Sequence, residues 1–582
     1  MLDREGTLEI DEAKGESAVR SADKCLAECQ YPTILPASQF KMFQETGNRM
    51  VWERPYHSRR ARLLVLAFAE AYKNDGKYMD CILDYLWAIL EESTWTIPAH
   101  QFTHPVIKDN KLPLLVKDGD MHTIALFSAT TASTLASVYL LVGKKLDEIS
   151  PLICERLKYE IEDRIIKPYL NIQFWWSGAN GGKINNWCPW IVSNVLFTAS
   201  VLEEDTEKRR AIAELSMEYL DRFTSVVPSD GGCDEGPHYW TKSTGAYYDA
   251  AEILYDMSGG KINIFAEKLL RDMCEYEAKA FINGDNYLNF ADCGPAIRND
   301  AVLIRRMGKR LGSELLVSFS GTVAKYNFMS LEANHGYRVI RHMIEKTVAV
   351  DGGTTFEKVW LPELGVMISR ETNLSDKGMY LALKGGHNDE NHNHNDIGNI
   401  VVYYNGKPVF IDAGSGEYTK FTFSDKRYTL WNTQSCYHNT VTVNGIAQLN
   451  GEQYRATCYD YDEATGGLSF ELKEAYPPEA KIKSLVRSAV LKDGRAEIKD
   501  KVEFDGVGEI DIHFLTHIKP EIQGDKITLA EGRVLTYDPA LTPCIETLEV
   551  DSVFESRWKS KELYAIRLKA TASCAEYVNY IE

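Results

Sequence analysis

The chain has 582 residues, of which 44% are hydrophobic and 26% charged, and its formal net charge is −19. A chain of this length divides into two or more domains, and its strong negative charge argues against general nucleic-acid binding. The 12 cysteines include no CxxC pair, which excludes a zinc ribbon and indicates reduced thiols rather than a disulfide framework.

No apolar stretch reaches the roughly 20 residues that span a bilayer. The N-terminal segment MLDREGTLEIDEAKG is charged and lacks the apolar core of a secretory signal. We therefore expect a cytoplasmic protein, or a secreted or periplasmic one if a signal has been removed. We expect neither nucleic acid nor a membrane as its partner, and the sequence does not indicate an oligomeric state.

The N-terminal part of the chain predicts helices, because its apolar residues recur with a period of 3.6. Arg59–Asn74 (RRARLLVLAFAEAYKN) and the Ala- and Ser-rich Ala125–Val142 show this period most clearly. Further periodic stretches lie at 151–167, 189–203, 208–224, 244–257 and 262–281. Several helices of this length, joined by aromatic loops, indicate a helical array or toroid.

The C-terminal part predicts short strands separated by turns. Asn399–Tyr404 and Pro408–Ile411 flank Asn405-Gly406, which is typical of a β-hairpin. Further β-rich runs are Thr440–Val443, Ser484–Leu491, Ala496–Phe504 and Glu509–Phe514. We expect a helical domain over residues 1–345 and an antiparallel β-sandwich over residues 346–582.

The densest polar cluster is GGHNDENHNHNDIGN, which contains His387, His392 and His394. The last two are two residues apart, so on an extended chain they project to the same side. Asp412 ends the returning strand of the predicted hairpin, and His438 precedes another strand. Two imidazoles and a carboxylate at strand ends are candidate ligands for a divalent metal. The alternative is a solvated histidine-rich loop.

A second segment, PSDGGCDEGPHYW, lies between two helical stretches and is shaped by glycine and proline. It presents Asp234, Glu235, His238 and Tyr239, and Lys242 follows it. A cation beside a tyrosine can lower the pKa of the phenol and make it a usable acid or base. The alternative is a tyrosine that packs on the core and bonds a backbone carbonyl.

A third segment, FWWSGANGGKINNWCPW, contains four tryptophans together with Asn185 and Asn186. Aromatic faces stack on sugar rings and amides bind hydroxyls or carboxylates, so the segment predicts a carbohydrate-binding cleft. Packing between helices is the alternative for some of the tryptophans. A weaker feature is the loop WTIPAHQFTH, which carries His100 and His104.

Together these segments resemble the heparinase II/III-like polysaccharide lyases, on the motifs NNW, DEGPHYW, HNHND, VFIDAG and HNTVTVNG in the family's order. The resemblance implies an incomplete (α/α) toroid followed by an antiparallel β-sandwich. It implies β-elimination of an acidic, uronate-containing glycan such as heparan sulfate, chondroitin sulfate or hyaluronan. Alginate or oligoalginate cleavage, a glycoside hydrolase on the same toroid, and a non-catalytic carbohydrate-binding protein remain alternatives.

The resemblance also implies a role for individual residues. Asn186 matches the asparagine that neutralises the uronate carboxylate, and Tyr239 and His392 match the proton-transfer pair. One divalent metal, zinc in most relatives and manganese or calcium as alternatives, is implied, and we expect it to be structural. The ligands implied for it are His394, Asp412 and His438.

Residues beside these motifs are candidate substrate contacts. Asn185 is the neighbour and substitute of the matched asparagine, and Lys242 lies where relatives often carry an arginine that binds substrate charge. His100 and Glu235 are further candidates. Trp187 stands where some alginate-cleaving relatives have a catalytic histidine, which disfavours an alginate-type site.

Overall fold

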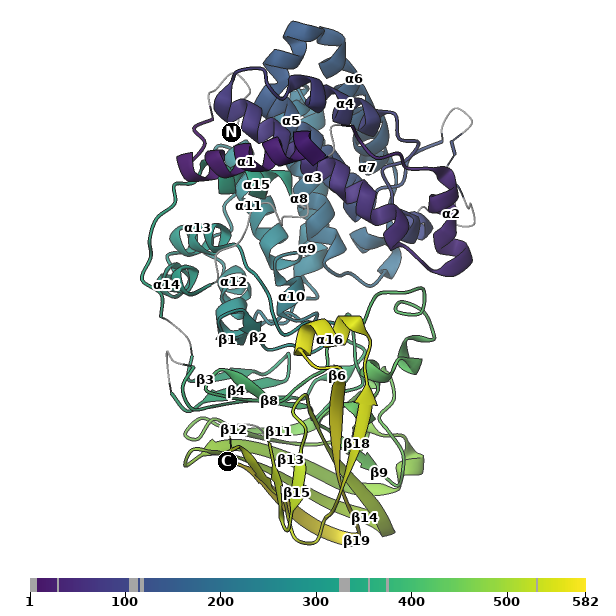
Figure 1. Ribbon diagram of the computed structural model, residues 1–582, viewed down its shortest axis with the longest axis vertical. Coiled ribbons are helices and arrows are strands. Elements are labelled where there is room, and N and C mark those ends of the chain that lie inside the picture. Colours follow the sequence, from purple (N-terminus) through teal and green to yellow (C-terminus); the bar gives the residue numbers. More distant parts are fainter. Residues whose placement is uncertain are drawn as a thin grey trace.

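A helical part lies above a β-sheet part in the computed structural model of the chain (Figure 1). The structure describes residues 8–28, 31–103, 112, 114–115, 120–323, 335–353, 356–372, 376–529 and 532–582.

The helical part is built from two layers of helices. The inner helices pack side by side in the order α3 (Met50–Lys73), α5 (Leu126–Ile149), α8 (Trp187–Leu202) and α11 (Thr244–Met257). Each has an outer partner, and in the same order these are α4 (Met79–Leu90), α6 (Pro151–Ile161), α9 (Thr206–Thr224) and α12 (Lys268–Ala280). This pairing of inner with outer helices confirms the predicted (α/α) toroid.

Further helices complete this part and the edge of the sandwich. They are α1 (Glu12–Glu28), α2 (Ala37–Thr46), α7 (Lys167–Asn171), α10 (Pro237–Trp240), α13 (Ala301–Leu311), α14 (Glu314–Thr322), α15 (Gly336–Ile344) and α16 (Ser552–Trp558). The stretch predicted as one helix over 151–167 is α6 followed by a π-helical turn, Glu162–Ile166, and α7. Periodicity predicts that such a stretch is helical but does not register a single wide turn within it.

Helix α5 is the one helix in the described ranges that is long and apolar enough to cross a membrane. Of its most apolar window, 89% is buried inside the protein. Packing against α3 and α8 therefore accounts for its composition.

The β part contains two large antiparallel sheets in the described part of the chain. The five-stranded sheet has the order β3 (Lys358–Leu361), β4 (Val366–Arg370), β5 (Met379–Lys384), β7 (Ile400–Tyr404) and β8 (Lys407–Phe410). The ten-stranded sheet has the order β11 (Thr457–Asp462), β12 (Gly467–Glu471), β13 (Ile482–Lys492), β14 (Arg495–Thr516), β19 (Glu562–Ile581), β17 (Val534–Thr536), β16 (Lys526–Thr528) and β15 (Glu521–Gln523). In addition, β9 (Val441–Val443) pairs with β14, and β18 (Thr542–Glu549) pairs with β19.

The five-stranded sheet is buried on both faces. Met367 and Leu381 pack into the core between the two sheets, whereas their neighbours Ile368 and Ala382 belong to the core of the helical part. This alternation follows from the two-residue period of a strand. The helical part therefore rests on the outer face of this sheet, and loops at the sheet's ends meet loops of the toroid.

Two predicted elements differ from the structure. Helix α12 ends at Ala280, and the hairpin of β1 (Phe281–Asn283) and β2 (Asn286–Tyr287) follows it within the region predicted as helical. The predicted runs 496–504 and 509–514 are one strand, β14, whose register with β19 shifts between Glu503 and Gly508. The chain does not turn between the two runs, and an irregularity in the pairing with β19 accommodates the residues between Glu503 and Gly508.

Candidate active site and metal centre

The site forms where three loops from distant parts of the sequence approach closely. The segment Phe290–Cys293 lies between two glycines with left-handed backbones, Gly236 (φ 82°) and Gly414 (φ 74°). A Cβ atom on Gly236 would lie 2.8 Å from the carbonyl oxygen of Phe290, and one on Gly414 would collide with the carbonyl oxygen of Cys293. Only glycine allows this approach, and the approach places Asp292 at the junction of both parts of the molecule.

Tyr239 and His392 face each other across this junction. Tyr239 lies on α10 of the helical part, and its ring stacks on the His392 imidazole with a centroid separation of 4.2 Å and an interplanar angle of 28°. His392 lies in a turn with φ of 55°. The expectation of an extended segment is therefore wrong at His392, although both His392 and His394 contact one carboxylate, that of Asp292.

Glu235 joins His392 to Asn186. Its Oε2 atom lies 3.2 Å from Nε2 of His392 and also accepts a hydrogen bond from the side-chain amide of Asn186. The backbone N–H of Asn186 donates to Oε1 at 3.1 Å. The three predicted catalytic residues, Asn186, Tyr239 and His392, thus lie in one buried cluster together with Glu235.

Asp292 is the residue that the sequence does not single out. Its Oδ2 atom lies 2.9 Å from Nδ1 of His392 and 3.2 Å from the hydroxyl of Tyr418. Its Oδ1 atom lies 3.0 Å from Nε2 of His394 and 2.9 Å from Nη2 of Arg427. Burial opposes ionisation, but hydrogen bonds from the two histidines and the charge of Arg427 hold the pKa of Asp292 well below its usual range. One carboxylate therefore connects His392 to the neighbouring histidine cluster.

The short loop ADCGP that contains Asp292 carries no motif. Tyr418 and Arg427 lie in GEYTKFTFSDKRY, which reads as an ordinary polar loop. Only the burial of Arg427 sets this segment apart, and burial cannot be read from the sequence. Its Nη2 also donates to the carbonyl of His392 at 2.9 Å.

The electrostatics of the site set the resting protonation states. Burial alone would lower the pKa of His392, but its hydrogen bonds with Asp292 and Glu235 raise it to about 9. Burial and the nearby Asp292 raise the pKa of Tyr239. Lys242 lies near Tyr239, with Nζ 4.8 Å from the ring centroid, yet the predicted lowering of the phenol pKa is wrong. The site therefore rests with a neutral phenol stacked on an imidazolium.

A second tyrosine extends this arrangement. The hydroxyl oxygens of Tyr239 and Tyr418 are 2.6 Å apart, and that of Tyr418 lies 3.3 Å from Nδ1 of His392. Tyr418 therefore bridges the phenol and the imidazole.

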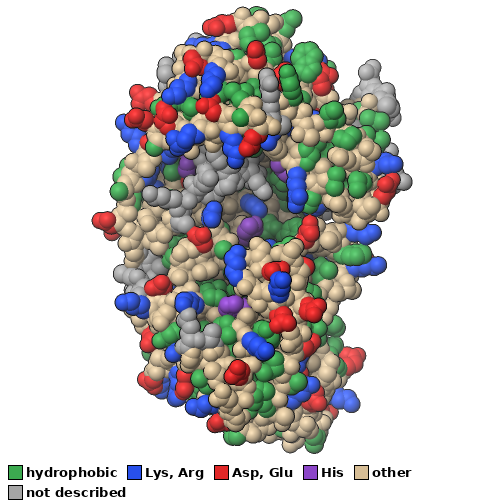
Figure 2. Space-filling view, in the orientation of Figure 1, with side chains coloured by type: hydrophobic (Ala, Val, Ile, Leu, Met, Phe, Trp, Pro, Cys, Tyr) green, Lys and Arg blue, Asp and Glu red, His purple; other side chains and the backbone are tan. Residues whose placement is uncertain are grey.

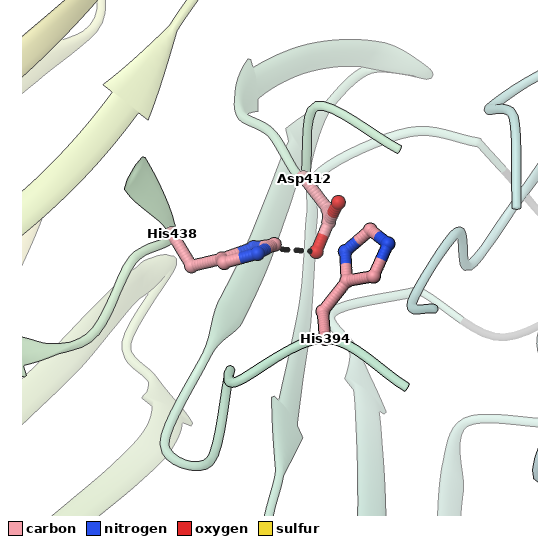
Figure 3. Close-up of side chains that lie close together, drawn as sticks. All are labelled: His394, Asp412 and His438. Atoms are coloured by element: carbon pink, nitrogen blue, oxygen red, sulfur yellow. Dashed lines mark hydrogen bonds and ion pairs between the residues drawn. The ribbon is translucent and has the colours of Figure 1, made fainter. Parts of the chain in front are cut away.

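The side chains of His394, Asp412 and His438 turn toward one another (Figure 3). One ligand atom from each lies within 4.8 Å of the others, and all three residues are buried. Nδ1 of His394 and Nε2 of His438 have no hydrogen-bond partner among the described residues. Buried polar atoms without partners are rare in folded proteins, and imidazole nitrogens with a carboxylate oxygen are ligands that suit a divalent metal. The three residues therefore fit a metal ion.

Neighbouring residues orient these ligands. Asn399 donates to Oδ2 of Asp412 at 2.7 Å, and the backbone N–H of Gly414 donates to Oδ1 at 2.7 Å. Asp292 holds the outer nitrogen of His394. Such outer contacts fix the orientation of metal-binding side chains. Burial lowers the pKa of His394, which favours the neutral ring that binds a metal.

The predicted substrate-contact residues do not all lie at one surface: some line a cavity and others are buried. Asn185, whose Oδ1 accepts from the backbone N–H of Trp187 at 3.1 Å, lines a cavity of about 470 Å³ together with Glu235 and His387. His100 is buried, and its ring centroid lies 4.5 Å from that of Trp187. Burial holds the pKa of His100 well below its usual range, so this ring supplies no positive charge. His104 lies outside the described residues.

The tryptophans of the third segment also divide. Trp176 and Trp190 are buried, and their indole N–H groups donate to the carbonyl of Ile124 and the hydroxyl of Thr130. These two are core residues. Trp175 and Trp187 are partly exposed, with ring centroids 5.1 Å apart.

The sequence of the β part can be compared with known protein families. Residues 354–558 match the family model "Heparinase II/III-like, C-terminal". No curated protein matches the chain.

Among solved structures, a heparan sulfate lyase HepC mutant from Pedobacter heparinus is similar over 98% of this chain and 83% of its own, with 14% identity and a TM-score of 0.61. A structure of heparinase III is similar over 99% of this chain and 85% of its own, with 16% identity and a TM-score of 0.63. At these identities the likeness establishes the fold of both parts.

Proposed function

We propose that the chain is a polysaccharide lyase, because residues 354–558 match the heparinase II/III-like C-terminal family model. It cleaves uronate-containing acidic glycans by β-elimination and leaves an unsaturated uronate at the new chain end. The observation that carries this proposal is the stacking of Tyr239 on His392 beside Asn186, with the groups supplied by both parts of the molecule.

β-Elimination removes the proton on the carbon that bears the uronate carboxylate and expels the glycosidic oxygen from the next carbon. The proton is weakly acidic while the carboxylate is charged, so the site must stabilise the enolate-like dianion that develops. The amide of Asn186 is placed for this, and Glu235 holds it beside the positively charged His392. Lys242 adds a second positive charge near Tyr239.

Tyr239 protonates the leaving oxygen. Its raised pKa keeps the phenol neutral at rest, which is the form that a general acid needs. His392 takes the proton for one uronate epimer once its own proton is released. For the other epimer the proton lies on the opposite ring face, and Tyr239 serves as the base once its phenol has lost its own proton, then returns the substrate's proton to the leaving oxygen as the acid. Each proton transfer contributes roughly 10²- to 10⁴-fold to the rate.

The metal proposed at His394, Asp412 and His438 is zinc, in a structural role. It would supply a fixed anchor for the strand ends, since these ligands lie next to the turn that carries His392. His392 itself remains outside the ligand set, because both of its ring nitrogens contact carboxylates.

The proposed substrate class is a glycosaminoglycan. Trp187 stands at the position where some alginate-cleaving relatives have a catalytic histidine, and its ring packs against His100. This difference disfavours alginate as the substrate. A glycoside hydrolase needs paired carboxylates that are free to act as acid and base. Glu235 and Asp292 are both engaged by His392 and by further donors, which disfavours that alternative.

The test is a panel of heparan sulfate, heparin, chondroitin sulfate, hyaluronan and alginate, followed by the ultraviolet absorbance of the unsaturated uronate. At least one polymer should give this product, and Tyr239→Phe should reduce its formation by roughly 100-fold or more. Tyr169→Phe is the matched control, because Tyr169 is also buried and also bonds a hydroxyl, that of Ser216 at 2.8 Å. Activity of Tyr239→Phe within tenfold of the unaltered protein would refute the assignment, and cleavage without an unsaturated product would refute the lyase.

A further inference from the structure

The face of the molecule is hollowed between the helical part and the β part, and a histidine side chain shows in the hollow (Figure 2). We name residues 418–426 the aromatic loop. It belongs to the β part and contains Tyr418, which contacts Tyr239, and two exposed phenylalanines, Phe421 and Phe423.

Phe423 lies directly against the candidate catalytic residues. Its ring centroid is 5.4 Å from that of His392 at 88° and 5.1 Å from that of Tyr418 at 83°. Nevertheless 61% of its surface is exposed. A large aromatic side chain that contacts the candidate catalytic cluster and still exposes most of its surface is suited to stack on a ligand.

Two cations of the same loop converge on the other phenylalanine. The Nζ atoms of Lys420 and Lys426 lie 5.5 and 5.2 Å from the ring centroid of Phe421, which is 37% exposed. Glu417 and Asp425 are also exposed nearby, so the loop as a whole is not basic. The two ammonium groups at one ring nevertheless form a local positive site that suits a carboxylate or a sulfate ester.

The loop contacts both parts of the molecule. At its end, Arg427 donates to the carbonyls of His392 and Asn393, each at 2.9 Å. The aliphatic stem of Lys420 lies against Gly47, where a Cβ atom would be 3.3 Å from Cγ and Cδ of the lysine. Gly47 follows α2, so the loop reaches from the sandwich to the helical part.

We propose that Phe423 is the stacking platform for the sugar at the cleavage point, and that Lys420 and Lys426 bind an acidic substituent of an adjacent sugar. This inference rests on the proposed lyase function and assigns a binding surface to it. It also supplies local positive charge for a polyanion in a chain whose net charge is −19.

The alternative to stacking is that Phe423 only covers His392. Phe423→Leu separates the two roles, because leucine keeps an apolar contact with His392 but has no flat face. Phe423→Trp keeps the face. Stacking predicts that Phe423→Leu raises KM roughly tenfold, while Phe423→Trp stays near the unaltered value. Covering predicts a change in kcat with KM preserved.

The experiment measures KM and kcat on heparan sulfate, and in parallel the Kd of a heparan sulfate hexasaccharide. Trp87→Leu is the matched control, since Trp87 is 67% exposed on the outer helix α4. A KM and Kd for Phe423→Leu within twofold of the unaltered protein would overturn the stacking role, as would a change confined to kcat. Because Kd is measured in the Tyr239→Phe background, in which cleavage is suppressed, absence of any lyase activity would remove the proposed function while the binding result still stands.

A separate experiment tests Lys420 and Lys426. Lys420→Gln combined with Lys426→Gln should raise Kd roughly tenfold for heparan sulfate and weaken its dependence on salt. A parallel loss on non-sulfated heparosan of the same length assigns the pair to the carboxylate, whereas a loss confined to the sulfated chain assigns it to a sulfate. An unchanged Kd for both would overturn the assignment of the lysines.

Discussion

Replacing Asp292 by Asn tests the carboxylate that connects the proton-transfer pair to the metal ligands. The change keeps the size of the side chain but removes its charge and turns one acceptor into a donor. In the structure both carboxylate oxygens accept hydrogen bonds, from two histidines, Arg427 and Tyr418. In the variant, the NH₂ group of the asparagine must replace one of these oxygens and therefore faces another hydrogen-bond donor, which is unfavourable.

The expected losses of stability and of kcat/KM in Asp292→Asn follow from the burial of the groups that Asp292 contacts. Arg427 is buried, and removing one partner of a buried ion pair costs about 3–5 kcal/mol because the other charge remains without compensation. Loss of the charged hydrogen bond that orients His392 costs about 1.5–3 kcal/mol. If that loss falls on the transition state, kcat/KM decreases roughly 10- to 150-fold.

The matched control is Asp500→Asn, which breaks a second buried ion pair that contacts neither Asp292 nor His392. Asp500 accepts two hydrogen bonds from Arg487, at 2.7 and 2.9 Å, within the sandwich. Thermal unfolding should show a comparable loss for both variants, but kcat/KM measured on folded protein should fall only for Asp292→Asn. A kcat/KM for Asp292→Asn within threefold of the unaltered protein, or an equal fall in the control, would refute the orienting role of Asp292.

Two further predictions address the neighbouring groups. His394→Ala should lose bound metal and melt at a lower temperature, because a missing ligand removes binding energy that contributes to folding. His392→Ala should keep its metal, and elemental analysis showing equal metal loss would make His392 a ligand. Burial and the neighbouring Glu235 raise the pKa of Asp234 to about 6, so the folded chain retains a proton that the unfolded chain releases near pH 4. The resulting stabilisation is complete below that pH and lost as the pH rises through about 6. Asp234→Asn should therefore flatten the decline in melting temperature over this interval, and an unchanged decline would contradict the prediction.

The sequence predicts elements well where one period dominates. Helix α9 coincides closely with the predicted stretch 208–224, and its start is set by Asp205, whose side chain accepts from the N–H groups of Glu207 and Lys208. The hairpin of β7 and β8 follows from Asn405-Gly406 because both residues adopt the left-handed conformation that this turn requires. The irregularity in β14 was not predictable, because a strand neighbour rather than the local sequence decides whether Asp505-Gly506 turns or continues the strand.

The site was predictable where a motif is dense and not where a residue acts alone. Tyr239, His392 and the metal ligands lie in short segments with unusual composition. Asp292 lies in a short loop after a hairpin and is 100 residues away from His392, so only the folded chain shows that they meet. The prediction that the pKa of Tyr239 is lowered was wrong for a similar reason. The sequence shows Lys242 three residues away, but burial outweighs it.

The division of the site between two parts of the chain has a consequence for how the protein acquires its activity. Domains generally fold as units, with the N-terminal one first during synthesis. A chain whose toroid alone has formed presents Tyr239 and Asn186 without His392, and so lacks one of the two proposed proton carriers. The complete proposed site then appears only when the sandwich docks, and turnover that depends on His392 becomes a readout of completed assembly.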